Sequence, residues 1–205
     1  MPPVNDAASS LDNPPSSPFA LFDSWFAEAS ASETVDPNAM TVATASPAGR
    51  PSARILLLKG RDARGFTFFT NTASRKGGEL LVNAQVALLF HWKSLARQIR
   101  IEGPVERVTD AEADAYYASR ARVSRLGAWA SEQSRPLGSR AELEARVAEF
   151  DAKYPGEAVP RPPHWSGFRC LPEYFEFWQD RPFRLHDRIS YAPNGSGWGT
   201  TRLYP

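Results

Sequence analysis

The sequence predicts a mainly β protein with flanking helices (α+β), organised as a β-barrel decorated with helices. Short strand-like runs recur from residue 40 to the C-terminal end and are separated by turn residues, whereas helix signals are few. The chain has 205 residues, of which 42% are hydrophobic and 12% aromatic. It can therefore bury one substantial core, and a single domain is expected.

The first ordered element is expected to be a helix. Residues 1–18 are rich in Pro, Ser, Asn and Asp, a composition that predicts a disordered N-terminal tail. Apolar side chains then recur at helical spacing at Phe19, Phe22, Trp25, Phe26 and Ala29. This amphipathic pattern opens the folded domain, which is predicted to span residues 19–205.

Strands and further helices follow along the chain. Alternating or apolar runs predict strands over residues 40–45, 52–58, 66–70, 86–92, 98–108, 168–178, 183–191 and 198–203. A helix is expected to begin near Ser74, and capping boxes at Thr109–Glu112 and Ser139–Glu142 predict two more. The remaining segments are predicted to be irregular at residues 120–136, which are basic, and extended at the proline-rich residues 154–163.

Composition narrows the class of function. The net charge of +1 gives no global field that would attract nucleic acid or an anionic membrane, so anion binding should depend on local clusters. Cys170 is the only cysteine, which excludes an internal disulfide and a cysteine-rich metal site and fits a reducing compartment. There is no apolar run long enough for a membrane span, and residues 1–18 lack the pattern of a signal peptide. A cytoplasmic enzyme or binding protein is expected.

The segment Arg184 to Arg188 carries an unusual row of cations. In an extended strand Arg184, His186 and Arg188 share one face, because side chains alternate between faces. Guanidinium groups suit phosphates and the carbonyl edges of ring systems, so a phosphorylated or heteroaromatic ligand is a natural candidate. The alternative is a solvated edge strand whose charges prevent aggregation.

Two further basic groups precede this row. Ser74, Arg75 and Lys76 stand at the expected start of a helix, where free backbone N–H groups and the helix dipole favour an anion such as phosphate. The alternative is an ordinary serine cap followed by two solvated bases. Arg54 and Lys59 bracket an apolar strand and fall on opposite faces of it, unless the strand ends or bulges near Lys59.

Taken together and in order, these motifs resemble the pyridoxamine/pyridoxine 5′-phosphate oxidase family. The resemblance runs from about Asp36 to the C-terminal end. It rests on residues 54–59, Thr70-Asn71 with Ser74-Arg75-Lys76, Arg97-Gln98, Ser119-Arg120, Gly127-Ala128-Trp129 with Gln133-Ser134, residues 165–168, 176–178, 184–188 and 202–205. It implies an FMN-binding split β-barrel and a homodimer with two active sites at its interface. It also implies oxidation of pyridoxamine or pyridoxine phosphate to pyridoxal 5′-phosphate by dioxygen, with release of hydrogen peroxide.

The resemblance also implies roles for individual residues. The implied cofactor contacts are Arg54, Lys59, Phe69, Thr70, Ser74, Arg75, Lys76, Gln98, Gln133, Ser134, Trp178 and Arg188, with Gln133 and Ser134 supplied by the partner subunit. The implied substrate-phosphate contacts are Lys59, Tyr116, Arg120 and Ser124. Arg184 and His186 are implied to lie over the substrate ring as the catalytic pair. Two clusters of bases agree with two phosphorylated ligands sharing one cavity.

Some positions depart from the family pattern. Phe69 replaces a common Tyr, and Ala121 and Arg125 replace a common Pro and Gln. The basic N-terminal segment that covers the substrate in many members is missing, since no Arg or Lys precedes Arg50. Two alternatives therefore stay open: a split-barrel flavin oxidase with another substrate, as in phenazine biosynthesis, and a non-catalytic carrier of flavin or pyridoxal phosphate.

Overall fold

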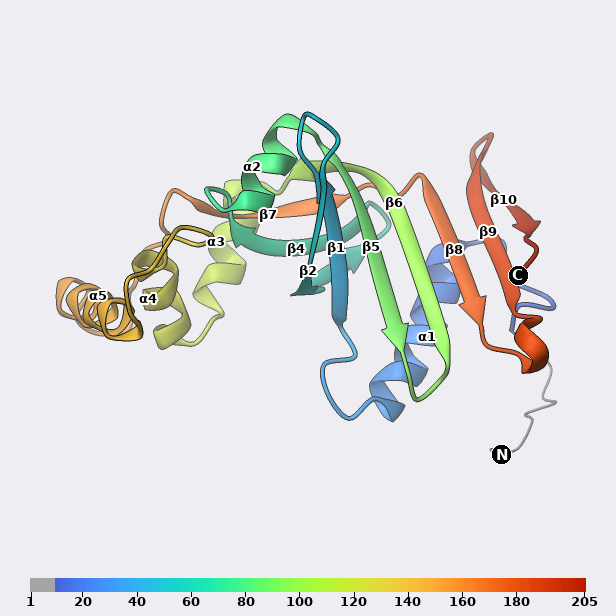
Figure 1. Ribbon diagram of the computed structural model, residues 1–205, viewed down its shortest axis with the longest axis horizontal. Helices are drawn as coiled ribbons and strands as arrows, with labels where there is room; N and C mark the ends of the chain where they lie inside the picture. The colour runs from blue at the N-terminus through green and yellow to red at the C-terminus, as the bar shows by residue number, and fades with distance from the viewer. Residues whose placement is uncertain (1–9) are drawn as a thin grey trace.

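The computed structural model describes residues 10–205 and consists of a curled antiparallel sheet with helices at one end and on one face (Figure 1). The helices are α1 (Pro18–Ser32), α2 (Arg75–Val82), α3 (Asp110–Ala118), α4 (Arg122–Ala130), α5 (Arg140–Lys153) and the 3₁₀ turn η1 (Pro182–Arg184). The strands are β1 (Ala39–Ala45), β2 (Pro51–Leu57), β3 (Gly60–Asp62), β4 (Gly65–Asn71), β5 (Gln85–Trp92), β6 (Arg97–Arg107), β7 (Trp165–Cys170), β8 (Tyr174–Gln179), β9 (Asp187–Asn194) and β10 (Gly197–Arg202). The prediction of a mainly β protein with flanking helices is confirmed.

The sheet divides at the long strand β6. Its main path is β10-β9-β8-β6-β5-β1-β2, and a branch runs from β6 through β7 and β4 to β3. Residues 97–102 of β6 pair with β8, whereas residues 105–107 pair with β7. Gly103 lies at the division, where a Cβ would stand 2.1 Å from the carbonyl oxygen of Leu171. A side chain there would force the two branches apart.

Helix α1 covers the inner face of the sheet with aromatic side chains. Phe22 and Trp25 are fully buried. The Phe22 ring meets Phe66 edge to face at 4.8 Å, and Trp25 meets Phe177 at 5.3 Å. Each such side chain contributes about 1.5–3 kcal/mol by its burial. The predicted helix is confirmed and begins one residue earlier than expected, at Pro18 behind the N-cap Ser17.

The structure corrects the predicted tail for residues 10–18. The Trp25 indole N–H donates to Ser10 Oγ at 2.8 Å, and the Tyr191 hydroxyl donates to the Pro15 carbonyl oxygen at 2.8 Å. Leu11 is fully buried in the main core. The polar composition gave no sign of this packing, because it depends on the Leu11 side chain, the Ser10 hydroxyl and the Pro15 carbonyl oxygen. The rest of the predicted tail, residues 1–9, lies outside the described residues.

Three further predictions need correction. The run over residues 168–178 forms two strands, β7 and β8, because the chain breaks at Pro172, which has no N–H for a ladder. The run over residues 183–191 forms η1 and then β9, because Phe183 and Arg184 take left-handed φ values of 60° and 63°. Residues 120–136 contain helix α4, and the short strand β3 was not predicted.

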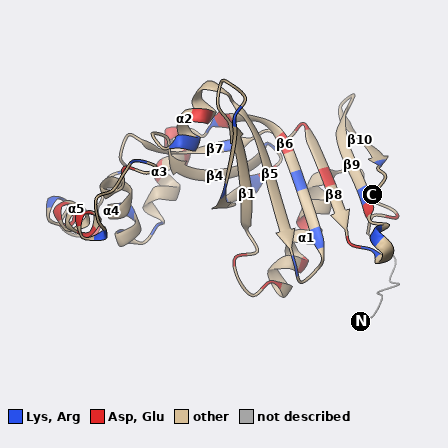
Figure 2. Cartoon of the chain, in the orientation of Figure 1, with Lys and Arg blue, Asp and Glu red and all other residues tan. Residues whose placement is uncertain are grey.

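Helices α3, α4 and α5 stand at one end of the sheet (Figure 1). The predicted capping box at Thr109–Glu112 is confirmed. Ser139 is the N-cap of α5 as predicted, but its capping box is incomplete, because the Glu142 side chain accepts from the Gly138 N–H. Trp129 of α4 packs on Phe150 and Tyr154 at 5.6 and 5.4 Å, while α5 otherwise presents mixed acidic and basic side chains (Figure 2). Among residues 10–205, no helix combines the length and apolar character needed to cross a membrane.

Candidate functional site

Helix α2 begins at a serine cap beside β1 and β2. Ser74 Oγ accepts a hydrogen bond from the Gly77 N–H at 3.3 Å. Gly77 allows the tight approach to the preceding loop, because a Cβ there would stand 2.4 Å from the Thr72 carbonyl oxygen. Arg75 and Lys76 therefore stand in the first turn of a capped helix, as the sequence predicts.

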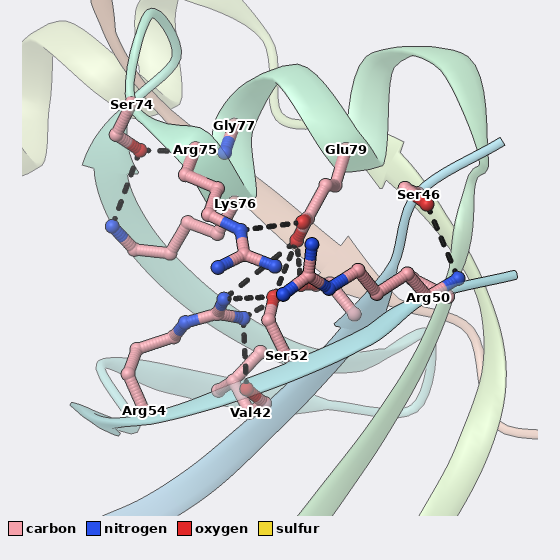
Figure 3. A network of polar contacts seen from close by, with 12 residues as sticks. Val42, Ser46, Arg50, Ser52, Arg54, Ser74, Arg75, Lys76, Gly77 and Glu79 are labelled. Atoms are coloured by element: carbon pink, nitrogen blue, oxygen red, sulfur yellow. Dashed lines mark hydrogen bonds and ion pairs between the residues drawn. The ribbon is translucent and has the colours of Figure 1, made fainter. Parts of the chain in front are cut away.

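The centre of this region is the buried carboxylate of Glu79 (Figure 3). Ser52 Oγ donates to it at 2.7 Å and Arg75 Nε at 2.9 Å, and Thr44 Oγ1 donates to the same carboxylate. Arg54 Nη2 lies 3.6 Å from it. Burial alone would raise the pKa of Glu79, but these hydrogen bonds outweigh burial and lower the pKa to about 2. We call Thr44, Ser52, Arg54, Arg75 and Glu79 the Glu79 network.

The network fixes the guanidinium of Arg54. Its Nη1 donates to the Val42 carbonyl oxygen at 3.1 Å and to Thr44 Oγ1 at 2.6 Å, and its Nη2 donates to Ser52 Oγ (Figure 3). β2 ends at Leu57, so Lys59 lies beyond the strand. The structure thus favours the reading in which the strand ends before Lys59.

Lys76 lies beside the network and is 6% exposed. Its Nζ donates to Gln133 Oε1 at 2.7 Å and to Ser74 Oγ at 3.2 Å, and Thr70 Oγ1 donates to the same Gln133 oxygen at 3.4 Å. Burial and the nearby charge of Arg54 lower the pKa of Lys76 to about 8. Within residues 10–205, the hydrogen bonds of Lys76 go to a hydroxyl and an amide oxygen, neither of which carries charge.

The contacts of Gln133 correct one expectation. The resemblance assigns Gln133 to the partner subunit, yet its side chain contacts Thr70 and Lys76 of its own chain. The Asn71 amide, which donates to the Ser131 carbonyl oxygen at 3.3 Å, ties the loop after α4 to the end of β4 and so brings Gln133 here. Ser134 follows in the same loop, is exposed and has a left-handed φ of 72°.

A stack of aromatic rings forms a second cluster near the end of β4. The Phe69 ring lies 4.1 Å from Tyr116 and 5.3 Å from Trp165, with interplanar angles of 19° and 9°. Gly167 makes room for it, since a Cβ there would stand 2.8 Å from the Phe69 ring. The Arg120 guanidinium lies 5.0 Å from the Trp165 ring centre, and its Nη1 is buried without a hydrogen-bond partner in the described chain. An orphaned cationic donor of this kind suits an anionic ligand.

The other expected substrate-phosphate residues are less closely gathered. Ser124 is exposed in the first half of α4. Lys59 is exposed and borders a cavity of about 260 Å³ together with Phe26, Asn38 and Arg61. The structure therefore brings Tyr116 and Arg120 together and leaves Lys59 apart from the Glu79 network.

A third cluster lies across β6, β8 and β9. Gln98 pairs with Trp178, and Trp178 pairs with Arg188, so the three side chains share one face of the sheet. Arg188 is held by the carboxylate of Glu176, with Nε donating at 2.9 Å, and Nη1 donates to the Tyr204 carbonyl oxygen at 2.9 Å. Glu176 is 3% exposed and also meets Arg100 Nη1 at 3.1 Å.

The predicted row of Arg184, His186 and Arg188 on one strand face is incorrect. Only Arg188 belongs to β9, because the two left-handed residues turn the chain before it. Residues 180–186, which we call the Arg184 loop, hold His186 with its ring centre 4.6 Å from Trp178. His186 Nδ1 lies 3.0 Å from Asp180 Oδ1 and 3.2 Å from the Arg181 backbone nitrogen, and Arg184 is exposed.

Sequence reasoning missed the carboxylate and hydroxyls that organise the bases. Glu79 stands four residues after Arg75, a spacing that pairs side chains on a helix and could have indicated this contact. Thr44 and Ser52 gave no comparable signal, because their contacts depend on how α2 docks on β1 and β2. Glu176 belongs to one of the motifs that carry the family resemblance, but no role for its side chain was predicted from the sequence.

Comparison with known proteins places these clusters in context. Residues 26–154 match the family model described as "Pyridoxamine 5'-phosphate oxidase", and residues 165–205 match "Pyridoxine 5'-phosphate oxidase C-terminal dimerisation region". A curated "Pyridoxine/pyridoxamine 5'-phosphate oxidase" of Gluconobacter oxydans is 66% identical, covering 92% of this chain and 94% of that protein. One of Azorhizobium caulinodans is 57% identical, covering 100% of this chain and 98% of that protein. The second family match indicates a homodimer.

Solved structures agree on the fold. PhzG from Burkholderia lata, solved with tetrahydrophenazine-1-carboxylic acid, has a TM-score of 0.91 at 36% identity and covers 98% of this chain and 99% of its own. A pyridoxamine 5′-phosphate oxidase-related, FMN-binding protein from Nostoc punctiforme has a TM-score of 0.73 at 17% identity and covers 92% of this chain and 98% of its own. These likenesses confirm the predicted split β-barrel.

Proposed function

Since this chain belongs to the pyridoxamine 5′-phosphate oxidase family, we propose that it binds FMN and oxidises pyridoxine 5′-phosphate and pyridoxamine 5′-phosphate to pyridoxal 5′-phosphate. The observation that carries the proposal is identity of 57–66% over nearly the whole chain to curated oxidases with these two substrates in their name. The chain is accordingly an oxidoreductase. The clusters described above supply groups of the required chemistry.

The Glu79 network and Lys76 fit the phosphate of FMN. Arg54, Arg75 and a charged Lys76 oppose one carboxylate, which leaves a local excess of positive charge for a phosphate dianion. The hydroxyls of Thr70 and Ser74 and the side-chain amide of Gln133 add neutral polar groups beside Lys76. We assign this region to the cofactor phosphate, and Gln98, Trp178 and Arg188 to the remainder of the cofactor.

These two groups of cofactor residues point to a site shared between subunits. Arg54 lies in a row with Val42 and Leu88 that faces the core, whereas Gln98 and Trp178 face the opposite side of the sheet. Between β2 and β8 lie four strand spacings, or roughly 19 Å along the sheet. One cofactor can therefore use both groups only if a second copy brings its own Gln98 and Trp178 to the first copy's network. Ile55, which is 63% exposed on the outer face of the sheet, supplies apolar surface for such docking.

The substrate side is proposed to use the aromatic stack and the Arg184 loop. Arg120, with Tyr116, Ser124 and Lys59, would hold the substrate phosphate, and Arg184 with His186 would lie over the pyridine ring. FMN, when bound, would supply a two-electron acceptor for oxidation at the substrate C4′ carbon, with dioxygen as final acceptor and hydrogen peroxide as product. The amine substrate also takes up water and releases ammonia. The protein contributes by orienting the substrate and excluding alternative poses.

A related activity is favoured by one observation. The high TM-score to PhzG supports an oxidase that acts on a phenazine precursor. The identity to PhzG is 36%, against 57–66% to the curated oxidases, so the phosphorylated pyridine remains the better supported substrate. Arg120 and Arg184 add cations that suit a phosphorylated ring. A non-catalytic carrier of flavin is the third outcome to be tested.

An absorption spectrum of the purified protein, followed by anaerobic addition of pyridoxine 5′-phosphate, tests the proposal. Oxidised flavin bands that bleach on addition, and peroxide release in air, are the expected results. A yellow protein that bleaches only with tetrahydrophenazine-1-carboxylic acid would indicate the related oxidase. Flavin that stays oxidised with every donor would indicate a carrier, and a colourless protein that takes up no added FMN would refute the cofactor assignment.

Mixing two variants with weakened FMN binding, with activity measured at an FMN concentration too low to restore either variant alone, tests the shared site. If Lys76 and Arg188 serve one cofactor from different subunits, a mixed dimer of Lys76→Ala and Arg188→Ala contains one intact site and one doubly altered site. Activity should therefore return when the two variants are unfolded together and refolded. If each site belonged to a single chain, the mixture would be no more active than its components.

The single cysteine, Cys170, is a buried free thiol, which supports the cytoplasmic location that the sequence predicts.

A further inference from the structure

We propose that residues 10–17 form a clasp that holds the Arg184 loop in position through Arg202 and Asp187. Arg202 and Asp187 are then positioning residues: they act on the substrate through the loop. The inference rests on the proposed function for the role of Arg184 and His186. The linkage itself follows from contacts between residues 10–17 and residues 181–202, which are far apart in the sequence.

The clasp is anchored in the main core. Leu11 is fully buried, and Ser10 accepts the Trp25 indole N–H at 2.8 Å. The hydroxyl of Tyr191, a fully buried residue of β9, donates to the Pro15 carbonyl oxygen at 2.8 Å. A buried hydroxyl without a partner is costly, so this bond ties residues 10–17 firmly to the C-terminal hairpin.

Arg202 connects the clasp to β9. Its Nη2 donates to the Leu11 carbonyl oxygen at 2.8 Å and lies 3.9 Å from Asp12 Oδ1. Its Nη1 donates to Asp187 Oδ1 at 3.4 Å. The planar guanidinium therefore bridges the clasp and the first residue of β9 with two different nitrogens, a geometry that a lysine cannot reproduce.

Asp187 passes the restraint on to the Arg184 loop. Its Oδ2 accepts from Arg181 Nε at 2.6 Å, and its side chain is 21% exposed. The Arg181 backbone N–H in turn donates to His186 Nδ1 at 3.2 Å. Both ends of the loop are thus joined to the carboxylate that Arg202 holds.

The loop needs a restraint of this kind. Phe183 and Arg184 are consecutive residues with φ near 60°, a conformation that side chains other than glycine rarely adopt. Such a backbone persists only when its surroundings determine it. Phe183 is 93% exposed and Leu185 68% exposed, so their own side chains add little packing within the described chain. The ties through Arg181 and Asp187 therefore add to the contacts of His186 with Trp178 and Asp180 in ordering the loop.

Three variants of the FMN-loaded protein test the inference. Arg202→Gln removes the bridge, Tyr191→Phe removes only the clasp's bond at Pro15, and Arg140→Gln is the matched control, since Arg140 pairs with Glu144 on exposed α5. Amide hydrogen exchange of residues 181–186 is measured without substrate. The rate of anaerobic flavin reduction by pyridoxine 5′-phosphate and the FMN dissociation constant are measured on the same samples.

Arg202→Gln should speed exchange in the loop and slow flavin reduction about tenfold, within the roughly hundredfold that a misplacement of about 1 Å can cost. Tyr191→Phe should change the exchange rate and the rate of flavin reduction in the same directions but by smaller amounts. Arg202→Lys should reduce flavin faster than Arg202→Gln and more slowly than the wild type. FMN affinity should fall by less than the rate of flavin reduction, because Arg202 has no contact with the Glu79 network, and Arg188 and Trp178 adjoin the loop without being altered. General destabilisation would instead weaken FMN binding in parallel.

Unchanged exchange in the loop for both Arg202→Gln and Tyr191→Phe would overturn the clasp. So would flavin reduction at the wild-type rate in Arg202→Gln, or a loss of FMN equal to the loss of rate. If the wild-type flavin were not reduced by pyridoxine 5′-phosphate, the proposed function would fail, and the exchange data would still decide whether the clasp orders the loop.

Discussion

The Glu79 network and the Arg184 loop both present cations, but they are held in opposite ways. In the network, two guanidinium groups and two hydroxyls converge on one carboxylate that is 7% exposed. In the loop, Arg184 is exposed and its backbone passes through two left-handed residues. The difference teaches that the proposed cofactor-phosphate end is organised by the fold, whereas the proposed substrate end depends on ties from outside its own segment.

Removing the centre of the network should have the largest effect. Glu79→Ala leaves Arg54 without its counter-charge and the hydroxyls of Thr44, which is buried, and Ser52, which is half-buried, without their acceptor. Breaking a buried pair from one side costs about 3–5 kcal/mol of unfolding free energy, which urea denaturation would measure. Glu144→Ala, on exposed α5, should cost no more than about 0.5 kcal/mol. Equal costs for the two variants would break the comparison.

Acid should remove the same contribution from the wild-type protein. The pKa of Glu79 is lowered from 4.5 to about 2, so its stabilising effect is complete above the unfolded value and fades as pH falls through the folded value. The stability difference between wild type and Glu79→Gln should therefore narrow between about pH 4.5 and about pH 2. A difference that stays constant over this interval would show that the charge of Glu79 is not what the network uses.

Arg120 tests whether the substrate side has a fixed element apart from the loop. Its Nη1 is buried without a partner beside the aromatic stack, so a substrate phosphate would complete it. Arg120→Ala should lose a charge-assisted contact of about 1.5–3 kcal/mol, roughly a ten- to hundredfold drop in kcat/KM, with FMN still bound. Wild-type kinetics with a phosphorylated substrate would remove Arg120 from the site.

Arg188 and Arg184 lie on the two sides of the boundary between strand and loop. Arg188→Ala should purify pale and regain activity with added FMN, because the lost contact weakens cofactor binding. Arg184→Ala should purify yellow and turn over about tenfold more slowly, since an interaction that matters most in the transition state lowers kcat. His186→Ala should have a similar or milder effect on kcat. Equal loss of FMN in all three variants would show that Arg184, His186 and Arg188 all serve cofactor binding and have no separate role toward the substrate.

How far the sequence predicts each region follows from the range of its contacts. Ser74, Arg75 and Lys76 were placed correctly because a strand, a loop and a capped helix are local signals. The docking of Thr44 and Ser52 onto Glu79 is a tertiary contact with no local signature. The alternation of Arg184 and His186 predicted a strand, and nothing in the residue types there indicates left-handed backbone, which usually requires Gly or Asn. The burial of Leu11 was likewise not predicted, because it is one apolar residue in a polar segment.

The change of FMN affinity with pH should be the smallest of the predicted effects. It depends on Lys76 beside the Glu79 network and not on the Arg184 loop, so it distinguishes the two regions most sharply. In the protein without ligand the pKa of Lys76 is about 8, because burial and Arg54 disfavour its charge. A phosphate dianion beside Nζ favours the charged form, so the pKa of Lys76 rises when FMN binds. FMN affinity should therefore be highest below about pH 8 and fall by about tenfold or less between about pH 7 and about pH 9.

The neighbours of Lys76 do not titrate in this interval, since Arg54 stays protonated, the pKa of Glu79 is about 2, and the second pKa of a phosphate monoester is near 6. Lys76→Arg replaces the titrating group by one that keeps its charge, so its FMN affinity should be flat from about pH 7 to about pH 9. Fluorescence titration of FMN into the wild type and into Lys76→Arg measures both curves. A parallel decline in the two proteins would place the titrating group elsewhere and separate Lys76 from the cofactor phosphate.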